Sequence, residues 1–248
     1  MRALKFFAAT LAVLTAALGL SCQAIQRKAL FYPTHDARDN GLARWAHDGE
    51  VIGYAREVPQ PRNVWLLLHG NGGQAADRTY ALSAFAPDDS VFILEYPGYG
   101  LRAGKPSRAS IDAAARQAYA LLRARFAHTP VCVAAESIGS GPASVLAGEA
   151  HAPDKLVYVV PFDNLKKVAR EHVSYLPVGL LLAGSWDNVQ ALKGYRGPVE
   201  VFGAERDQVI PVAHAQSLAA SLPQAQFHLV PGGHNDWSMQ AEVRIRNP

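Results

Sequence analysis

From residue 48 onward, short apolar runs alternate with stretches of helical periodicity. This alternation is typical of repeated strand–helix units, which build a mostly parallel sheet with helices on both faces. Several of the runs are almost continuously apolar, as expected of strands that are buried on both faces. The sequence therefore predicts an α/β fold, with strands at residues 51–57, 64–69, 91–95, 131–135, 156–160, 199–203 and 226–230.

The clearest helical pattern covers residues 110–126, where apolar side chains share one face and Ser110 is the expected N-cap. Residues 162–197 form the longest stretch without a strand signal, and a small cap over the cleft is expected there. No internal repeat or Pro/Gly linker divides the chain, so we expect a single domain over residues 28–248. Further helices are expected at residues 74–85, 138–149, 212–222 and 236–245.

The first 21 residues have the features of an export signal. Arg2 and Lys5 precede an uncharged run at residues 6–20. At about 1.5 Å of rise per residue, this run is too short to cross the ~30 Å hydrocarbon core of a bilayer as a helix. We therefore expect a signal peptide over residues 1–21 rather than a membrane-spanning helix.

The signal ends in a sequence that is similar to a bacterial lipobox, Leu18-Gly19-Leu20-Ser21-Cys22. A lipobox usually has leucine where this chain has Gly19. The similarity implies cleavage before Cys22 and acylation of that cysteine, which would anchor an exported protein to a membrane of the bacterial cell envelope. Cleavage after Ala24 and an uncleaved anchor are the alternatives. Intact mass of the membrane fraction distinguishes an acylated Cys22 from an unmodified one.

The charge balance argues against a nucleic-acid partner. The chain has 24 Lys and Arg against 21 Asp and Glu, and removal of Arg2 and Lys5 with the signal leaves 22 against 21. Binding to phosphates needs a concentrated basic surface, which a body so close to neutral is not expected to have. The only cysteines, Cys22 and Cys132, exclude a disulfide-rich scaffold and a cysteine-based structural zinc site.

A serine follows the predicted strand at residues 131–135, in the sequence Ala135-Glu136-Ser137-Ile138-Gly139. A serine at a tight strand-to-helix turn needs small residues two positions before and after it, as Ala135 and Gly139 are. The start of the following helix would also direct backbone N–H groups toward an oxyanion formed at Ser137. Taken alone, a serine between small residues is more often a turn or a helix cap than a nucleophile.

This pentapeptide resembles the nucleophile elbow of the α/β-hydrolase family, with Ala135 where the family most often has glycine. His69-Gly70-Asn71-Gly72-Gly73 follows another predicted strand and resembles the oxyanion loop of the same family. The resemblance implies that the backbone N–H groups of Asn71 and Ile138 hold the developing negative charge. His69 is expected to support the loop rather than to act in catalysis.

The acid of an α/β-hydrolase triad is expected in a loop that follows a strand. Residues 205–211 are similar to the Asp-x-Val-x-Pro segment after the seventh strand of the family, which implies that Asp207 is the acid. Asp163 is the rival, because some α/β-hydrolases take the acid from the loop after the preceding strand. Glu205 is a weaker candidate and is expected to be a solvated charge.

The base is expected to be His234, because Pro231-Gly232-Gly233-His234 is similar to the glycine-glycine-histidine loop of the family. The resulting chain order, serine then acid then histidine, is the one that α/β-hydrolases use. The resemblance implies a serine hydrolase that cleaves an ester or thioester through an acyl-enzyme, with Ser137, Asp207 and His234 as the triad. It calls for no metal, nucleotide or flavin.

The resemblance covers residues 28–245 and is closest to small hydrolases with a minimal cap, which include protein depalmitoylases and esterases. A small acyl ester or thioester is therefore the expected substrate. The apolar stretch at residues 175–182 of the cap could receive an acyl chain or pack in the core. A membrane-tethered binding protein without catalysis and a serine peptidase are the alternatives, although no propeller domain or amine-binding acid is evident for a peptidase.

Overall fold

A computed structural model of the chain describes residues 27–36, 39–173, 178, 182 and 184–246. The expected signal and Cys22 lie outside these residues, as does most of the apolar stretch at 175–182. Within the described part of the chain, no helix is both long and apolar enough to cross a membrane.

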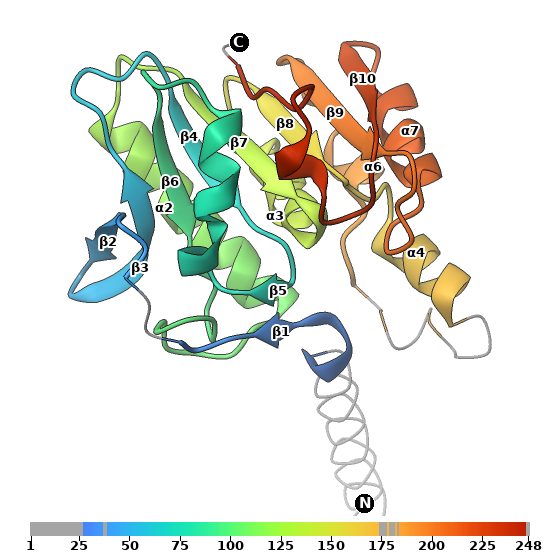
Figure 1. Cartoon of the computed structure of the whole chain (residues 1–248), viewed down its shortest axis with the longest axis horizontal. Helices are drawn as coiled ribbons and strands as arrows, with labels where there is room; N and C mark the ends of the chain where they lie inside the picture. Colours follow the sequence, from blue (N-terminus) through green and yellow to red (C-terminus); the bar gives the residue numbers. More distant parts are fainter. Residues whose placement is uncertain (1–26, 37–38, 174–177, 179–181, 183, 247–248) are drawn as a thin grey trace, which may run out of the picture.

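An eight-stranded sheet forms the centre of the structure, in the strand order β10-β9-β8-β7-β4-β6-β3-β2 (Figure 1). The strands from β10 to β6 in this order are parallel to one another, whereas β3 is antiparallel to both β6 and β2. Every residue of β4 and β6 is buried, as expected of strands covered on both faces. The bounds are β2 Ala43–His47, β3 Glu50–Arg56, β4 Val64–Leu68, β6 Ser90–Leu94, β7 Val131–Glu136, β8 Leu156–Val159, β9 Val199–Ala204 and β10 Ala225–Val230.

Helices cover both faces of the sheet, and each face has its own apolar core. One core contains apolar side chains of α2, α3 and α7, and the other contains those of η1, η3 and the segment that follows η3. The prediction of a mostly parallel sheet between two helical layers is therefore confirmed. The helical elements are η1 Ala75–Ala84, α2 Arg108–Arg125, η2 Ser137–Gly139, α3 Ser140–Leu146, α4 Leu165–His172, α6 Asn188–Ala191, α7 Val212–Ala220 and η3 Trp237–Met239.

The start of α2 differs from the prediction. Ser107, and not Ser110, is the N-cap of the helix: its side chain accepts a hydrogen bond from the backbone N–H of Ser110. The side chain of Ser110 in turn accepts one from the backbone N–H of Ser107, which completes a capping box. The prediction placed the cap three residues too late because either serine has the chemistry of a cap.

The helix expected at residues 236–245 was also wrong, because only the single turn η3 forms there. Val243 and Ile245 are both buried, whereas Arg244 between them is exposed. In an extended segment, side chains two positions apart point to the same side, so this pattern is typical of extended backbone. In agreement, Ile245 forms a β-bridge to Phe85. The helix expected at 138–149 is shorter than predicted, because α3 ends at Leu146.

Two features of the described fold are not indicated by the sequence, namely strand β2 and a small second sheet. Strand β2 has only Trp45 fully buried, so it lacks the apolar run by which the other strands were recognised. A second, two-stranded sheet joins β1 (Tyr32–Pro33) to β5 (Gly72–Gly73) in parallel and so ties the N-terminal segment to the loop after β4.

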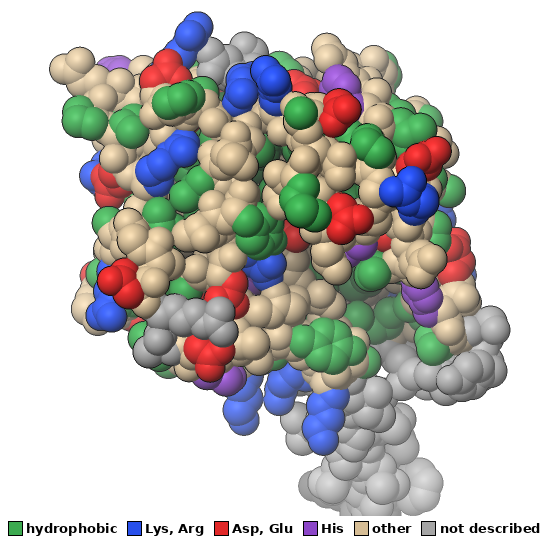
Figure 2. Space-filling view, viewed as in Figure 1, with side chains coloured by type: hydrophobic (Ala, Val, Ile, Leu, Met, Phe, Trp, Pro, Cys, Tyr) green, Lys and Arg blue, Asp and Glu red, His purple; other side chains and the backbone are tan. Residues whose placement is uncertain are grey.

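The stretch expected to form a cap contains α4 and α6 in its described part. Both helices begin with a side-chain cap, Asn164 for α4 and Asp187 for α6, and these two residues also form an isolated bridge with each other. On the face drawn in Figure 2, acidic and basic side chains are interspersed, in line with the near-neutral composition.

Candidate active site

Ser137 lies at the carboxyl end of β7, where η2 begins. Its φ of +53° is in the left-handed region, which non-glycine residues rarely adopt. The sharp turn brings Gly139 so close to β4 that a Cβ there would collide with the carbonyl oxygen of Leu68. Glycine at 139 is therefore required by close backbone approach, as the sequence argument assumed.

The structure brings the three residues predicted as a triad into contact. His234 follows β10, and its Nε2 lies 2.9 Å from Oγ of Ser137. Asp207 follows β9, and its Oδ2 lies 2.7 Å from Nδ1 of His234. An ionised carboxylate can only accept, so Nδ1 carries the proton and Nε2 is left to accept from the serine hydroxyl. This arrangement suits His234 to act as a general base toward Ser137.

Asp207 is fixed by its own loop as well as by the histidine. Its second oxygen, Oδ1, accepts hydrogen bonds from the backbone N–H groups of Val209 at 2.9 Å and Ile210 at 2.8 Å. The carboxyl side chain is only 1% exposed. Because both oxygens are occupied, the carboxylate has one orientation, and it holds the imidazole of His234 in one tautomer.

The rival acid Asp163 pairs with a different histidine. Its Oδ1 lies 2.7 Å from Nδ1 of His214, and its Oδ2 lies 2.6 Å from Nζ of Lys167 and 3.0 Å from Oγ of Ser217. Burial alone would raise the pKa of Asp163, but the hydrogen bonds from these three side chains hold it well below its usual range. The hydrogen bond to Asp163 raises the pKa of His214 in turn. This cluster, in which Asp163 and His214 are buried, joins α4 to α7.

Glu205, the weaker candidate, has an exposed side chain and lies 3.8 Å from Nη1 of its neighbour Arg206. It has the character of a solvated charge, as expected.

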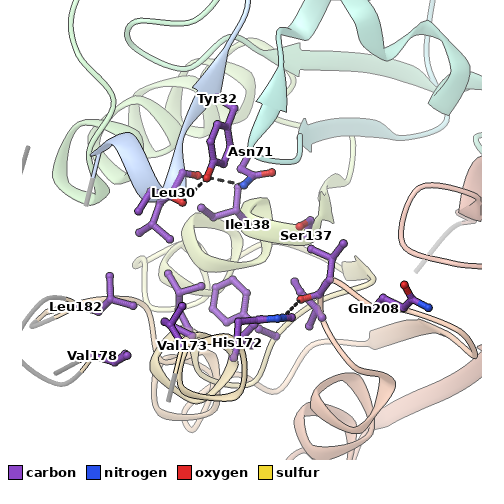
Figure 3. Close-up of a pocket in the computed structure, with 17 residues that line it drawn as sticks. Leu30, Tyr32, Asn71, Ser137, Ile138, His172, Val173, Val178, Leu182 and Gln208 are labelled. Atoms are coloured by element: carbon purple, nitrogen blue, oxygen red, sulfur yellow. Dashed lines mark hydrogen bonds between the residues drawn. The ribbon is translucent and has the colours of Figure 1, made fainter. Parts of the chain in front are cut away.

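Asn71 and Ile138, the predicted oxyanion donors, line the same cavity as Ser137 (Figure 3). The loop that carries Asn71 is fixed by its carbonyl oxygens: Tyr96 Oη donates to His69 O at 2.9 Å, and Tyr99 Oη donates to Asn71 O at 2.8 Å. Burial raises the pKa of both tyrosines, so their hydroxyls stay protonated and able to donate. His69 is fully buried in this network, which agrees with the expected supporting role.

A cavity of about 540 Å³ opens beside Ser137. Among the described residues that line it, none is Asp, Glu, Lys or Arg, and most are aliphatic. Helix α4 forms one wall, and Nε2 of His172 at its end lies 2.8 Å from the carbonyl oxygen of Val209 in the acid loop (Figure 3). The cavity can therefore receive an uncharged, apolar group attached to a carbonyl at Ser137.

Sequence reasoning found only part of this cavity. Val178 and Leu182, from the apolar stretch for which an acyl site and core packing were the two alternatives, line it. Leu30 and Tyr32 of the N-terminal segment also line it, a role that no pattern in the sequence indicates. Their position depends on the pairing of β1 with β5, which joins residues about forty positions apart. Among the described residues, no group of three or more His, Cys, Asp or Glu side chains is arranged to hold a metal ion.

Comparison with known sequences finds no family model that matches the chain. An uncharacterized protein of Mycobacterium tuberculosis is 31% identical over 176 residues, which are 69% of this chain and 62% of that protein. Human alpha/beta hydrolase domain-containing protein 17C is 26% identical over 226 residues, which are 85% of this chain and 65% of that protein. The chain thus spans less than two thirds of the length of these relatives.

Solved structures show the same fold at low identity. TT1662 from Thermus thermophilus superposes with a TM-score of 0.63 at 21% identity and covers 78% of this chain and 90% of its own. The Pyrococcus furiosus esterase Pf2001 gives a TM-score of 0.63 at 13% identity, with 82% of this chain and 91% of its own covered. MenH from Staphylococcus aureus gives 0.58 at 15% identity, with 76% and 93% covered.

Proposed function

We propose that this chain, which has the α/β-hydrolase fold, is a serine hydrolase that cleaves carboxylic esters or thioesters through an acyl-enzyme. The observation that carries the proposal is the continuous line of contacts from Ser137 through His234 to Asp207. These side chains come from the ends of three strands and are 70 and 27 positions apart along the chain. A line of nucleophile, base and orienting acid is the arrangement by which a weak hydroxyl nucleophile is activated.

In the proposed reaction, His234 takes the proton of Ser137 as the hydroxyl oxygen attacks the substrate carbonyl. Asp207 compensates the positive charge that forms on the imidazole. The backbone N–H groups of Asn71 and Ile138 hold the oxyanion, and loss of one such donor typically costs about 3 kcal/mol. His234 then protonates the leaving group, and the acyl group on Ser137 is released by a water that His234 activates.

Covalent labelling by a fluorophosphonate tests the proposal. The reagent reacts with an activated serine, so we expect one adduct, which peptide mass mapping assigns to Ser137 among all the serines of the chain. A folded chain that takes up no label would contradict the proposal. Such a result would select the alternative of a binding protein that has the fold without catalysis.

The uncharged cavity supports an aliphatic acyl group as the substrate side that enters the enzyme. Each methylene of the acyl chain that is buried from water lowers the free energy of the bound transition state by up to about 0.8 kcal/mol. This corresponds to a rise of about fourfold in kcat/KM. We therefore expect kcat/KM to rise from p-nitrophenyl acetate to the octanoate. A steep fall beyond four carbons would contradict a long acyl pocket.

Narrowing the cavity should remove this preference. Ala169 lies on α4 in the cavity wall, so Ala169→Phe should lower kcat/KM for the octanoate by about tenfold, since overpacking costs about 1–3 kcal/mol. The acetate, whose acyl group ends at its methyl carbon, should change little. Ala213→Phe, on an exposed position of α7, is the matched control and should alter neither ester. An equal loss for both esters in Ala169→Phe would show that the wall does not contact the acyl chain.

A further inference from the structure

A buried ion pair lies behind the oxyanion loop, outside the triad. Glu136 directly precedes Ser137 and is 6% exposed, and Arg78 on η1 is 9% exposed. Nη1 of Arg78 lies 3.8 Å from Oε2 of Glu136. Desolvation offsets much of the attraction in a buried ion pair, so stabilisation of the fold is a weak reason for this one.

The carboxylate of Glu136 joins three segments that carry the active site. The backbone N–H of Gly70, in the oxyanion loop, donates to Oε2 at 3.4 Å. Nε1 of Trp237, in η3 after His234, donates to Oε1 at 3.3 Å. The hydroxyl of Tyr80 donates to both oxygens at 3.1–3.2 Å. One side chain therefore links the turn of the nucleophile, the loop of Asn71 and the turn after the base.

The guanidinium of Arg78 holds the other end of the oxyanion loop. Its Nη2 donates to the carbonyl oxygen of Gly72, and its Nη1 donates to the Tyr80 hydroxyl at 2.8 Å. The contact between Arg78 and Gly72 favours glycine at position 73. A Cβ there would lie 3.2 Å from Nη2 of Arg78, and Gly73 has a φ of +85°. The loop is thus bound on both sides of Asn71, because Arg78 contacts Gly72 and Glu136 contacts Gly70.

The loop needs such support because three of its five residues, at positions 70, 72 and 73, are glycines. Glycine has the widest conformational freedom of any residue, so the loop has little rigidity of its own. An oxyanion donor must lie about 2.7–3.1 Å from the charge that forms. We infer that Arg78 and Glu136 are positioning residues, which hold the N–H of Asn71 at the oxyanion site beside Ser137. The inference rests on the proposed hydrolase function.

The inference is tested by Glu136→Gln and Arg78→Met in the full-length chain. Each variant should lower kcat by about 10²-fold, as does the loss of one oxyanion donor, with little change in KM. Binding of an alkyl trifluoromethyl ketone should weaken in parallel, because its adduct with Ser137 bears an oxyanion. The double variant should be no worse than either single one, since the two act as one unit. Arg78→Lys keeps the charge and should recover part of kcat.

The matched control is a second ion pair, in which Nζ of the buried Lys155 lies 2.6 Å from Oε1 of the partly buried Glu200 on β9. Glu200→Gln removes a charge from a comparable pair away from the site, so it should lower the melting temperature without lowering kcat. The inference is overturned if Glu136→Gln and Arg78→Met keep normal kcat and ketone affinity, or if Glu200→Gln lowers both as much as they do. A wild-type chain that neither labels with fluorophosphonate nor hydrolyses an ester overturns the proposed function and this inference with it. Normal wild-type activity with unaffected variants overturns this inference alone.

Discussion

Ser137→Ala is expected to lower kcat for p-nitrophenyl butyrate by about 10⁶-fold, the loss typical when the nucleophile of a serine hydrolase is removed. The fold should be retained, because alanine has the same Cβ as serine and adds no strain to the turn at a φ of +53°. Residual turnover should stay above the rate in water, since the oxyanion donors and the cavity remain. Initial rates and a thermal melt of the same preparations measure both effects.

Ser144→Ala is the matched control for this variant. Ser144 is another buried serine, on α3, and its Oγ donates to the carbonyl oxygen of Ser140 at 2.8 Å. It lies outside the line of contacts between Ser137 and His234, so its removal should leave kcat within a few-fold of wild type. If Ser137→Ala keeps more than about 1% of wild-type kcat, Ser137 is not the nucleophile, because removal of a triad serine typically costs about 10⁶-fold in kcat.

The sheet could be predicted from the sequence because strands buried on both faces must be apolar almost throughout. The strand expected at residues 64–69 is such a run, and β4 spans Val64–Leu68 with every residue buried. The loops of the candidate site could also be predicted, because the segments around Ser137 and His234 resemble the corresponding loops of the α/β-hydrolase family. In both cases a few adjacent residues are enough to make the prediction.

Features that depend on distant pairings could not be predicted. Arg78 and Glu136 are 58 positions apart, and each taken alone is typical of a solvated charge. The cavity wall at Leu30 and Tyr32 exists because β1 pairs with β5, and neither two-residue strand has a periodicity to detect. Such contacts follow from tertiary packing, which overrides local preference.

Asp207→Asn should lower kcat by about 10⁴-fold without unfolding the chain. The amide oxygen should replace Oδ1, because the N–H groups of Val209 and Ile210 need an acceptor there. The amide NH₂ then faces Nδ1 of His234 and donates to it. This fixes the imidazole in the wrong tautomer, with an N–H rather than a lone pair toward Ser137. The pH–rate profile and the melting temperature of this variant distinguish the loss of a base from a loss of structure.

Asp163→Asn is the decisive counterpart, because it alters a second buried Asp–His pair with the same 2.7 Å contact. It should leave kcat within a few-fold of wild type but lower the free energy of unfolding by about 3 kcal/mol, as expected when one partner of a buried pair is removed. The depressed pKa of Asp163 gives stability that is present above about pH 4, its unfolded value, and is lost as pH falls through the folded pKa.

The raised pKa of His214 gives a stabilisation with the opposite pH dependence. This stabilisation is fully present below about pH 6.5 and is lost as pH rises through the folded pKa. The difference in unfolding free energy between wild type and Asp163→Asn should therefore be largest between about pH 4 and pH 6.5. Denaturant titrations across this range measure it. If Asp163→Asn instead abolishes turnover at wild-type stability while Asp207→Asn stays active, the acid of the triad is Asp163 and the contact between Asp207 and His234 is structural.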